Sequence, residues 1–312
     1  MSNEQTLTVP HGVSRRKFLQ FCGLMAATLA LPTEYAGRIA SALTTAIRPP
    51  VIWLEFQDCT GDSESFLREP TLIDVLLDKL SVDYHETLMA PAGRMAEKSR
   101  LDTVQKYKGQ YVCIVEGAIP TGNNGVYAMI GGRTALSIAQ EVCSNALATI
   151  AVGTCAWDGG LSAANPNPTG ALGVAAAVPG LKTLINLPGC PVNVYNITAT
   201  IVHYLTFNQW PATDSQGRPL FAYGEEIHEE CERHDFYEEE RFVLAWGDEG
   251  HKQGWCLFKM GCKGPQTKSN CPSVKWNGGT NFPIGAGHGC IGCATSKFWD
   301  RMTPFYRALP DD

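Results

Sequence analysis

Apolar and polar positions along residues 50–207 follow two periods in turn, which is the pattern of strands that alternate with helices. Short apolar runs, each suited to a buried strand, occupy residues 51–56, 111–116, 148–152 and 183–187. Between them, apolar residues recur at helical spacing in residues 72–80, 136–146 and 194–207. Strands that alternate with helices form a parallel sheet covered on both faces, so the sequence predicts an α/β fold.

The regular pattern fades beyond about residue 210, where the chain is rich in Gly, Pro and Cys. A stretch of this kind owes its order to bound cofactors more than to a large apolar core. The 312 residues suit about two domains. We therefore expect a sheet domain over 49–209 and a cysteine-rich, mostly irregular and helical domain over 210–312.

The N-terminus carries a twin-arginine signature, Ser14-Arg15-Arg16-Lys17-Phe18-Leu19. An apolar stretch over 21–31 follows, and it is too short to span a bilayer. This order of features is typical of a targeting peptide that is removed after export, with its flank reaching residue 45 and cleavage near residues 40–42. The alternative is a chance basic pair before a buried helix. No later apolar run is long enough to anchor the chain in a membrane.

Composition narrows the function classes. Hydrophobic residues make up 44% and charged residues 18%, which is typical of a globular protein. The formal charge of −6 and the lack of a basic stripe argue against nucleic acid as a partner. Twelve cysteines indicate disulfides, zinc or iron–sulfur clusters. Twin-arginine export moves folded proteins, so clusters can be inserted beforehand, and this favours clusters over disulfides.

Three cysteines follow predicted strands directly. Cys59, Cys155 and Cys190 each come just after an apolar run. Ligands of open parallel sheets bind beyond the carboxyl ends of the strands, so these three thiols are expected to converge on one site.

Six further cysteines lie between Cys231 and Cys293. One group offers a histidine and three thiols, enough for a cubane cluster, and a second offers three thiols, enough for a cluster that lacks one iron. The first group is His228, Cys231, Cys256 and Cys262, and the second is Cys271, Cys290 and Cys293. Zinc remains an alternative, since three Cys and one His also form structural zinc sites.

From about Pro49 to near Lys297 the chain resembles the small subunit of [NiFe] hydrogenases. Ordered motifs carry the resemblance: Asp58-Cys59-Thr60-Gly61, Val115-Glu116-Gly117-Ala118-Ile119-Pro120, Gly153-Thr154-Cys155-Ala156, Asn165-Pro166-Asn167-Pro168-Thr169-Gly170, Pro188-Gly189-Cys190-Pro191, Gly261-Cys262-Lys263-Gly264-Pro265, and Ala286-Gly287-His288 with Cys290 and Cys293.

The resemblance implies a flavodoxin-like sheet domain, an iron–sulfur domain and three clusters in a line. Cys59, Cys155 and Cys190 match ligands of a proximal [4Fe–4S] cluster. The three-thiol group matches a medial [3Fe–4S] cluster, and the group with His228 matches a distal [4Fe–4S] cluster. The nickel–iron centre would lie on a partner large subunit in a heterodimer or higher oligomer. Electrons would pass on to a membrane cytochrome or iron–sulfur acceptor.

Asp62 departs from the family pattern Cys-Thr-Gly-Cys, because it stands where the fourth thiolate belongs. Its carboxylate completes the proximal cluster, or that corner is open, or another group such as Asp158 ligates it. A further alternative is that Asp62 only caps the following helix. Some oxygen-tolerant members carry extra cysteines at positions that match Gly61 and Gly160, so that form of tolerance is not expected here.

The expected function is electron transfer within an exported enzyme that oxidises H2. Three alternatives remain: a non-catalytic H2 sensor, an iron–sulfur subunit of a related respiratory complex, and a zinc-stabilised exported binding protein. Cys113 and Cys143 fall on apolar positions and are expected to be small buried hydrophobes. Glu64 and Glu116 are expected to be ordinary hydrogen-bonded or solvated carboxylates.

Overall fold

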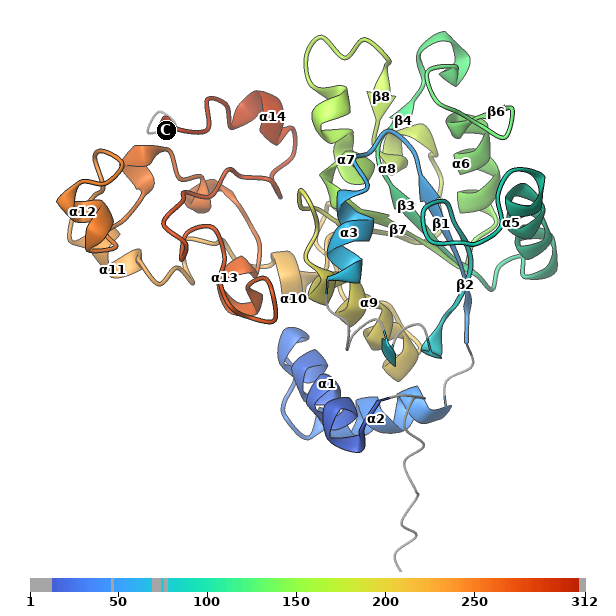
Figure 1. Ribbon diagram of the computed structural model, residues 1–312, viewed down its shortest axis with the longest axis horizontal. Coiled ribbons are helices and arrows are strands. Elements are labelled where there is room, and N and C mark those ends of the chain that lie inside the picture. Colours follow the sequence, from blue (N-terminus) through green and yellow to red (C-terminus); the bar gives the residue numbers. More distant parts are fainter. Residues whose placement is uncertain (1–12, 46–47, 69–73, 76–77, 309–312) are drawn as a thin grey trace, which may run out of the picture.

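A computed structural model describes residues 13–45, 48–68, 74–75 and 78–308. Its centre is a five-stranded parallel sheet in the order β2-β1-β3-β7-β9 (Figure 1). The strands are β1 (Pro50–Glu55), β2 (Ser81–His85), β3 (Val112–Glu116), β7 (Ala148–Val152) and β9 (Leu184–Leu187). Counted along the chain, this is the order 2-1-3-4-5 of flavodoxin-like folds, so the predicted fold class is confirmed.

Each face of the sheet has its own apolar core, because successive side chains of a strand point to opposite faces. In β1, Val51 and Trp53 enter one core, whereas Ile52 and Leu54 enter the other. Helices α3 (Gly61–Leu67) and α9 (Val194–Phe207) cover the first face. Helices α5 (Arg94–Lys106), α6 (Ala135–Ser144) and α8 (Val174–Ala177) cover the second.

Smaller elements connect these layers in the sheet domain. They are β4 (Ile119–Pro120), η1 (Gly122–Gly125), β5 (Met129–Ile130), β6 (Arg133–Thr134), α7 (Gly153–Asp158), η2 (Gly160–Ala163) and β8 (Ala171–Leu172). Strand β4 pairs with β8, and β5 pairs with β6, in both cases antiparallel.

The predicted strands and the helices over 136–146 and 194–207 are confirmed to within two residues at each end. Of the helix predicted over 72–80, residues 74–75 and 78–79 are helical, whereas 72–73 and 76–77 lie outside the described residues. Strand β2 and helix α5 were not predicted. Only Tyr84 and His85 of β2 are buried, and α5 buries just Arg100, Thr103 and Val104, so neither has a strong apolar period.

The twin-arginine segment forms a helical hairpin of α1 (Arg15–Thr28) and α2 (Tyr35–Thr45) that packs on α9 (Figure 1). Ser14 caps α1 by accepting a hydrogen bond from the backbone N–H of Lys17. One face of α1, with Phe21 and Met25, is buried in the core that α9 shares. Arg15 and Arg16 are exposed in the first turn, as a recognition motif requires.

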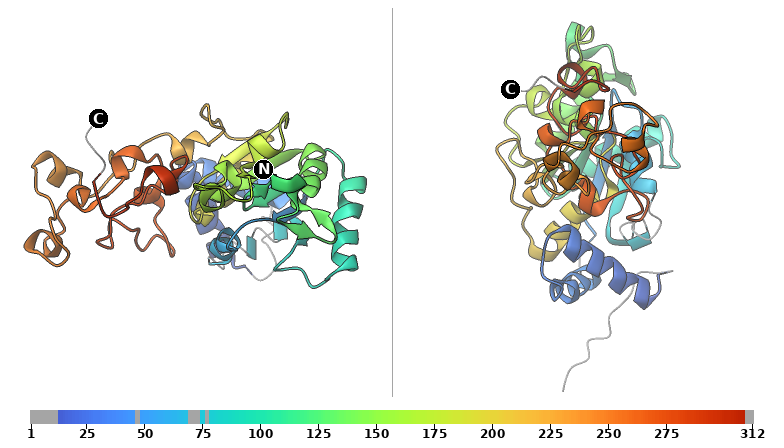
Figure 2. Two further views of the ribbon diagram at one scale, coloured as in Figure 1. Left: turned by 90° about the horizontal axis from the view of Figure 1, so that it is seen from above. Right: turned by 90° about the vertical axis from the view of Figure 1, so that its left-hand side faces the viewer.

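The C-terminal part of the chain extends from one end of the sheet domain and gives the molecule an elongated shape (Figure 2). Its helices are short: α10 (Leu220–Tyr223), α11 (His234–Glu238), α12 (Glu249–Lys252), η3 (Phe258–Met260), η4 (Gly264–Gln266), α13 (Cys271–Val274) and α14 (Phe298–Arg301). Its buried apolar cluster is small, and it includes Cys262 and Cys290, two of the predicted metal ligands. In the described part of the chain, no helix has the length and apolar character needed to cross a membrane.

The hairpin can be tested by a matched pair of substitutions in α1. Met25 is fully buried, whereas Leu24 beside it is 39% exposed. Met25→Ala removes buried contacts worth about 2–5 kcal/mol. It should therefore speed proteolysis of the connection over residues 29–34 in the full chain. Leu24→Ala should behave as the parent. Equal cleavage rates in both variants would show that the hairpin is not packed.

Candidate metal centres

The three strand-end cysteines lie beyond the carboxyl ends of central strands. Cys59 is in the turn between β1 and α3, Cys155 is in α7 directly after β7, and Cys190 follows β9. These strands are close neighbours in the sheet, with β3 between β1 and β7. The parallel topology therefore places the three thiols at one edge of the sheet.

Electrostatics show that these thiols share a site with Asp62. Burial raises the pKa of Cys155 to about 12, and negative charge on Cys190, Asp62 and Cys59 adds to the effect. Burial likewise raises the pKa of Cys190 to about 11, with further contributions from Asp62 and Cys59. Cys155 and Cys190 thus each feel the charge of Asp62 and Cys59. Thiols with pKa values this high need a bound cation before they lose their protons at neutral pH.

Asp62 lies inside the first turn of α3 and does not cap it. The N-cap position belongs to Thr60, so the helix-cap alternative does not describe this carboxylate. Its Oδ1 accepts a hydrogen bond of 2.7 Å from the backbone N–H of Val192. Its Oδ2 has no hydrogen-bond partner among the described residues. Burial, and then the charge of Glu116, raise the pKa of Asp62 to about 8. One oxygen is therefore free to ligate a cation in this site.

Asp158, the alternative carboxylate, accepts a hydrogen bond on each of its two oxygens. Its Oδ1 accepts from the backbone N–H of Gly160 at 3.1 Å, and its Oδ2 accepts from that of Lys297 at 2.5 Å. These bonds tie α7 to the C-terminal part of the chain. The geometry therefore favours Asp62 over Asp158 as the fourth group of the proximal set.

Glu116, at the end of β3, holds the turn that carries Cys59 and Asp62. It is fully buried, and its carboxylate accepts hydrogen bonds from the backbone N–H groups of Asp62 at 2.9 Å and Ser63 at 3.1 Å. The Ser63 hydroxyl donates to it at 2.5 Å and the Trp53 indole N–H at 3.1 Å. A negative charge at the first amides of a helix also matches the helix dipole.

Further buried polar groups support this anchor from β1 and β2. The Ser63 hydroxyl lies 3.2 Å from Nε2 of His85, whose Nδ1 lies 3.1 Å from the Thr87 hydroxyl. Glu55 accepts from the backbone N–H of Thr87 at 3.0 Å. Burial raises the pKa of Glu55 to about 7 and lowers that of His85 to about 4. The start of α3 is thus fastened to the ends of three strands.

Three glycines leave room for the proximal ligands. A Cβ atom on Gly153 would lie 2.0 Å from Oδ2 of Asp62, and one on Gly160 would lie 2.7 Å from Sγ of Cys155. A Cβ on Gly61 would lie 3.0 Å from Sγ of Cys59. The two positions that match extra cysteines in some family members therefore stand directly against sulfurs of the predicted proximal set.

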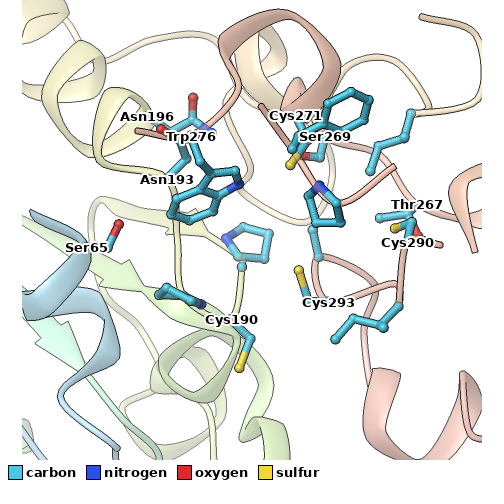
Figure 3. Close-up of a pocket in the computed structure, with 18 of the residues that line it drawn as sticks. Ser65, Cys190, Asn193, Asn196, Thr267, Ser269, Cys271, Trp276, Cys290 and Cys293 are labelled. Atoms are coloured by element: carbon cyan, nitrogen blue, oxygen red, sulfur yellow. The ribbon is translucent and has the colours of Figure 1, made fainter. Parts of the chain in front are cut away.

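The predicted medial thiols line a cavity of about 670 Å³ between the sheet domain and the C-terminal part (Figure 3). Cys271 begins α13, and Cys290 and Cys293 lie on the segment before α14. Cys190 of the proximal set lines the same cavity. Burial raises the pKa of Cys293 to about 12, with added effects from the charges of Cys271 and Cys190.

The predicted distal ligands line a second, smaller cavity together: His228, Cys231, Cys256 and Cys262. The ring of His228 packs edge-on against Tyr237, with 4.5 Å between ring centres. Burial lowers the pKa of His228, which favours the neutral imidazole that metals bind. All four predicted ligands are thus brought to one place.

The medial thiols lie between the other two sets. The backbone N–H of Cys290 donates to Sγ of Cys262 at 3.3 Å, which joins the medial set to the distal one. On the other side, the charge of Cys190 acts on Cys293. The structure therefore arranges the three predicted sets in series.

Donors aimed at sulfur occur at both C-terminal sets, as is common at iron–sulfur sites. The Ser269 hydroxyl lies 3.2 Å from Sγ of Cys271 in the medial set, and the backbone N–H of Arg233 donates to Sγ of Cys231 in the distal set at 3.4 Å. Within the described residues, no three His, Cys, Asp or Glu side chains gather round one point as a single ion requires. The sulfurs instead border cavities.

Two buried cations beside these sets were not predicted from the sequence. Lys263 follows Cys262 directly and is fully buried, and Arg233 lines the distal cavity. The only sequence signal for Lys263 is its place in a cysteine motif. Cys113 and Cys143 are buried as expected, with 3.7 Å between their sulfurs. Cys22, for which no burial was predicted, is buried in α1.

Comparison with known families divides the matched chain into two ranges. Residues 223–306 match the family model for the C-terminal part of the NiFe/NiFeSe hydrogenase small subunit. Residues 59–204 match the model described as NADH ubiquinone oxidoreductase, 20 Kd subunit.

Individual proteins match over nearly the whole chain. The periplasmic [NiFe] hydrogenase small subunit 1 of Nitratidesulfovibrio vulgaris is 46% identical over 300 residues, which cover 95% of this chain and 94% of that protein. The hydrogenase-2 small chain of Escherichia coli K12 is 43% identical over 94% of this chain and 79% of its own length. Among solved structures, a [NiFeSe]-hydrogenase of Dm. baculatum superposes with a TM-score of 0.78 at 35% identity, covering 85% of this chain and all of that one.

The parallel-sheet domain and the cysteine-rich C-terminal region, with family matches over both, define the chain as a subunit of an oxidoreductase. The chain belongs to the [NiFe] hydrogenase small-subunit family, whose members transfer electrons and whose nickel–iron centre lies on the partner large subunit.

Proposed function

We propose that this chain conducts electrons from the nickel–iron centre of a large subunit through two [4Fe–4S] clusters and one [3Fe–4S] cluster during H2 oxidation. The observation that carries this proposal is the serial arrangement of the three predicted sets: Cys190 lines the same cavity as the medial thiols, and the backbone N–H of medial Cys290 donates to Sγ of distal Cys262. When bound, the clusters supply one-electron redox chemistry. The chain's own residues hold them at fixed places and bury them from water.

The proposed medial and distal ligands line the two cavities, and the proposed proximal ligands are the strand-end cysteines with Asp62. Cys59, Asp62, Cys155 and Cys190 would hold the proximal cluster. The medial cluster would be held by Cys271, Cys290 and Cys293, and the distal cluster by His228, Cys231, Cys256 and Cys262. His228 supplies a neutral ligand where the other sites have thiolates, so the distal site would carry less negative charge and retain electrons better.

The match over residues 59–204 raises the alternative of an iron–sulfur subunit in a related respiratory complex. The match over residues 223–306 favours the hydrogenase, because that range contains all seven ligands of the proposed medial and distal sites.

We propose further that the complex is exported folded by the twin-arginine route to the periplasm and delivers electrons to a membrane cytochrome or iron–sulfur acceptor. Support comes from the exposed Arg15 and Arg16 and from a relative that is named a periplasmic hydrogenase subunit. On this proposal, residues 1–45 are the signal and its flank, 49–209 the proximal-cluster domain, and 210–312 the domain of the other two clusters.

Purification with the large subunit, followed by metal analysis and EPR spectroscopy, tests the proposed clusters. The oxidised complex should show a [3Fe–4S] signal and contain iron for all three clusters. Stoichiometric zinc without iron would refute the proposal, since zinc is the metal that three Cys and one His bind without iron–sulfur chemistry.

Asp62 should set the potential of the proximal cluster. Thiolate donates more charge to iron than carboxylate does, so Asp62→Cys should lower that potential. Asp62→Ala should leave one corner iron labile and slow electron exit. Redox titration and iron content of the three forms provide the measurement, and the medial EPR signal serves as an internal control. Equal potentials and equal iron contents would show that Asp62 is not a ligand.

Export should depend on the arginine pair. The double substitution Arg15→Lys and Arg16→Lys should leave the complex in the cytoplasm, folded and active in H2 oxidation. The large subunit, which we expect to lack its own signal, should remain there with it. Arg38→Lys, an exposed change in α2 outside the motif, is the control. Unchanged periplasmic activity of the double variant would contradict the assignment.

A further inference from the structure

Lys263 is a fully buried lysine fixed between two proposed ligand sets. It follows Cys262 of the distal set, and its backbone N–H donates to the carbonyl of Cys290 in the medial set at 2.8 Å. Its own carbonyl accepts from the Thr267 hydroxyl at 2.7 Å. These bonds fix the backbone of Lys263 against both sets, and its ammonium group donates to the carbonyl of Arg307.

Among the described residues, no Asp or Glu pairs with the ammonium group of Lys263, which donates to the backbone carbonyl of Arg307. Burial lowers the pKa of Lys263, and negative charge on Cys262 and on Cys290 opposes that shift. An unpaired charge in a protein interior costs several kcal/mol, so a buried ammonium is expected to have a counter-charge nearby.

Other buried cations of the sheet domain and the domain junction have such a partner. Arg218, which also donates to the carbonyl of Ala294, pairs with Asp214 at 2.8 Å. Arg100 is fully buried and pairs with Glu97 and Glu141. Local carboxylates neutralise these arginines, whereas at Lys263 the nearby negative groups are the cysteines of two ligand sets.

We propose that Lys263 is a counter-charge shared by the medial and distal clusters, and that it raises the reduction potentials of both. This inference rests on the proposed function, because the clusters supply the negative charge. A cation between two clusters raises both reduction potentials. It therefore favours electron transfer from the proximal cluster and leaves the difference between the medial and distal potentials nearly unchanged. Removing the charge makes transfer from the proximal to the medial cluster less favourable and leaves transfer from medial to distal nearly unchanged.

A purely mechanical role for Lys263 makes a different prediction. The bond to Arg307 holds the segment that passes over Gly261, where an added Cβ would lie 2.5 Å from the carbonyl oxygen of Phe305. If this hydrogen bond were the whole role of Lys263, any side chain that donates to the carbonyl of Arg307 would serve equally. Glutamine can donate but carries no charge, so it separates the two roles.

The experiment compares three variants as heterodimers with the large subunit. Lys263→Gln keeps a donor and loses the charge, and Lys263→Arg keeps the charge. Lys259→Gln removes the charge of an exposed lysine four residues earlier, which solvent screens. EPR-monitored redox titration gives the potentials of all three clusters. In Lys263→Gln, the medial and distal clusters should each hold an electron about tenfold less well, about 59 mV for a one-electron couple.

The proximal potential should stay at the parent value in all variants, and the arginine and Lys259 variants should match the parent throughout. Parent-like potentials in Lys263→Gln with full iron content would overturn the proposal. The hydrogen bond to Arg307 would then be the role of Lys263. If Lys263→Gln loses iron, iron retention in Lys263→Arg supports the charge requirement, and iron loss in both overturns it in favour of a steric role. A parent complex without cluster signals refutes the proposed function instead, before Lys263 is tested.

Discussion

The hydrogen bonds between the Glu116 carboxylate and the first amides of α3 fix the place of the predicted proximal site. Together with the backbone bridge between Gln57 and Ala118, this buried carboxylate attaches the turn that carries Cys59 and Asp62 to the end of β3. Glu116 ends β3, so the turn is positioned by the strand that lies between β1 and β7. A rigid sheet therefore determines where three thiols and a carboxylate meet.

The C-terminal region depends on a different constraint. Its apolar cluster is small and contains Cys262 and Cys290, so predicted ligands of the medial and distal sets form part of its buried interior. Short helices and turns satisfy the backbone, but few apolar contacts hold the segments together. Bound clusters would act as the crosslinks of this region, and its folding should be coupled to their insertion. That coupling suits a route that exports proteins already folded.

Strand-end cysteines were predictable because parallel topology brings the carboxyl ends of strands to one edge of the sheet. The edge strand β2 was not predictable from the sequence, since a strand with only Tyr84 and His85 buried has no clear alternation of apolar and polar residues. The position of Asp62 in its motif was visible, but its bond to Val192 joins residues 130 positions apart and has no sequence signature. Lys263 was missed for the same reason: burial of a lysine depends on the fold around it.

The proposed ligands depart from all-thiolate coordination at both ends of the relay, and the two departures act in the same direction. A carboxylate at Asp62 donates less charge to iron than a thiolate, and a neutral imidazole at His228 removes a negative charge. Lys263 adds positive charge between the medial and distal sets. Each of these features favours the reduced state of its cluster. Asp62 would raise the potential of the proximal cluster, and Lys263 and His228 would raise the potentials of the medial and distal clusters. Because all three potentials rise together, electrons that leave the large subunit would still move in a favourable direction.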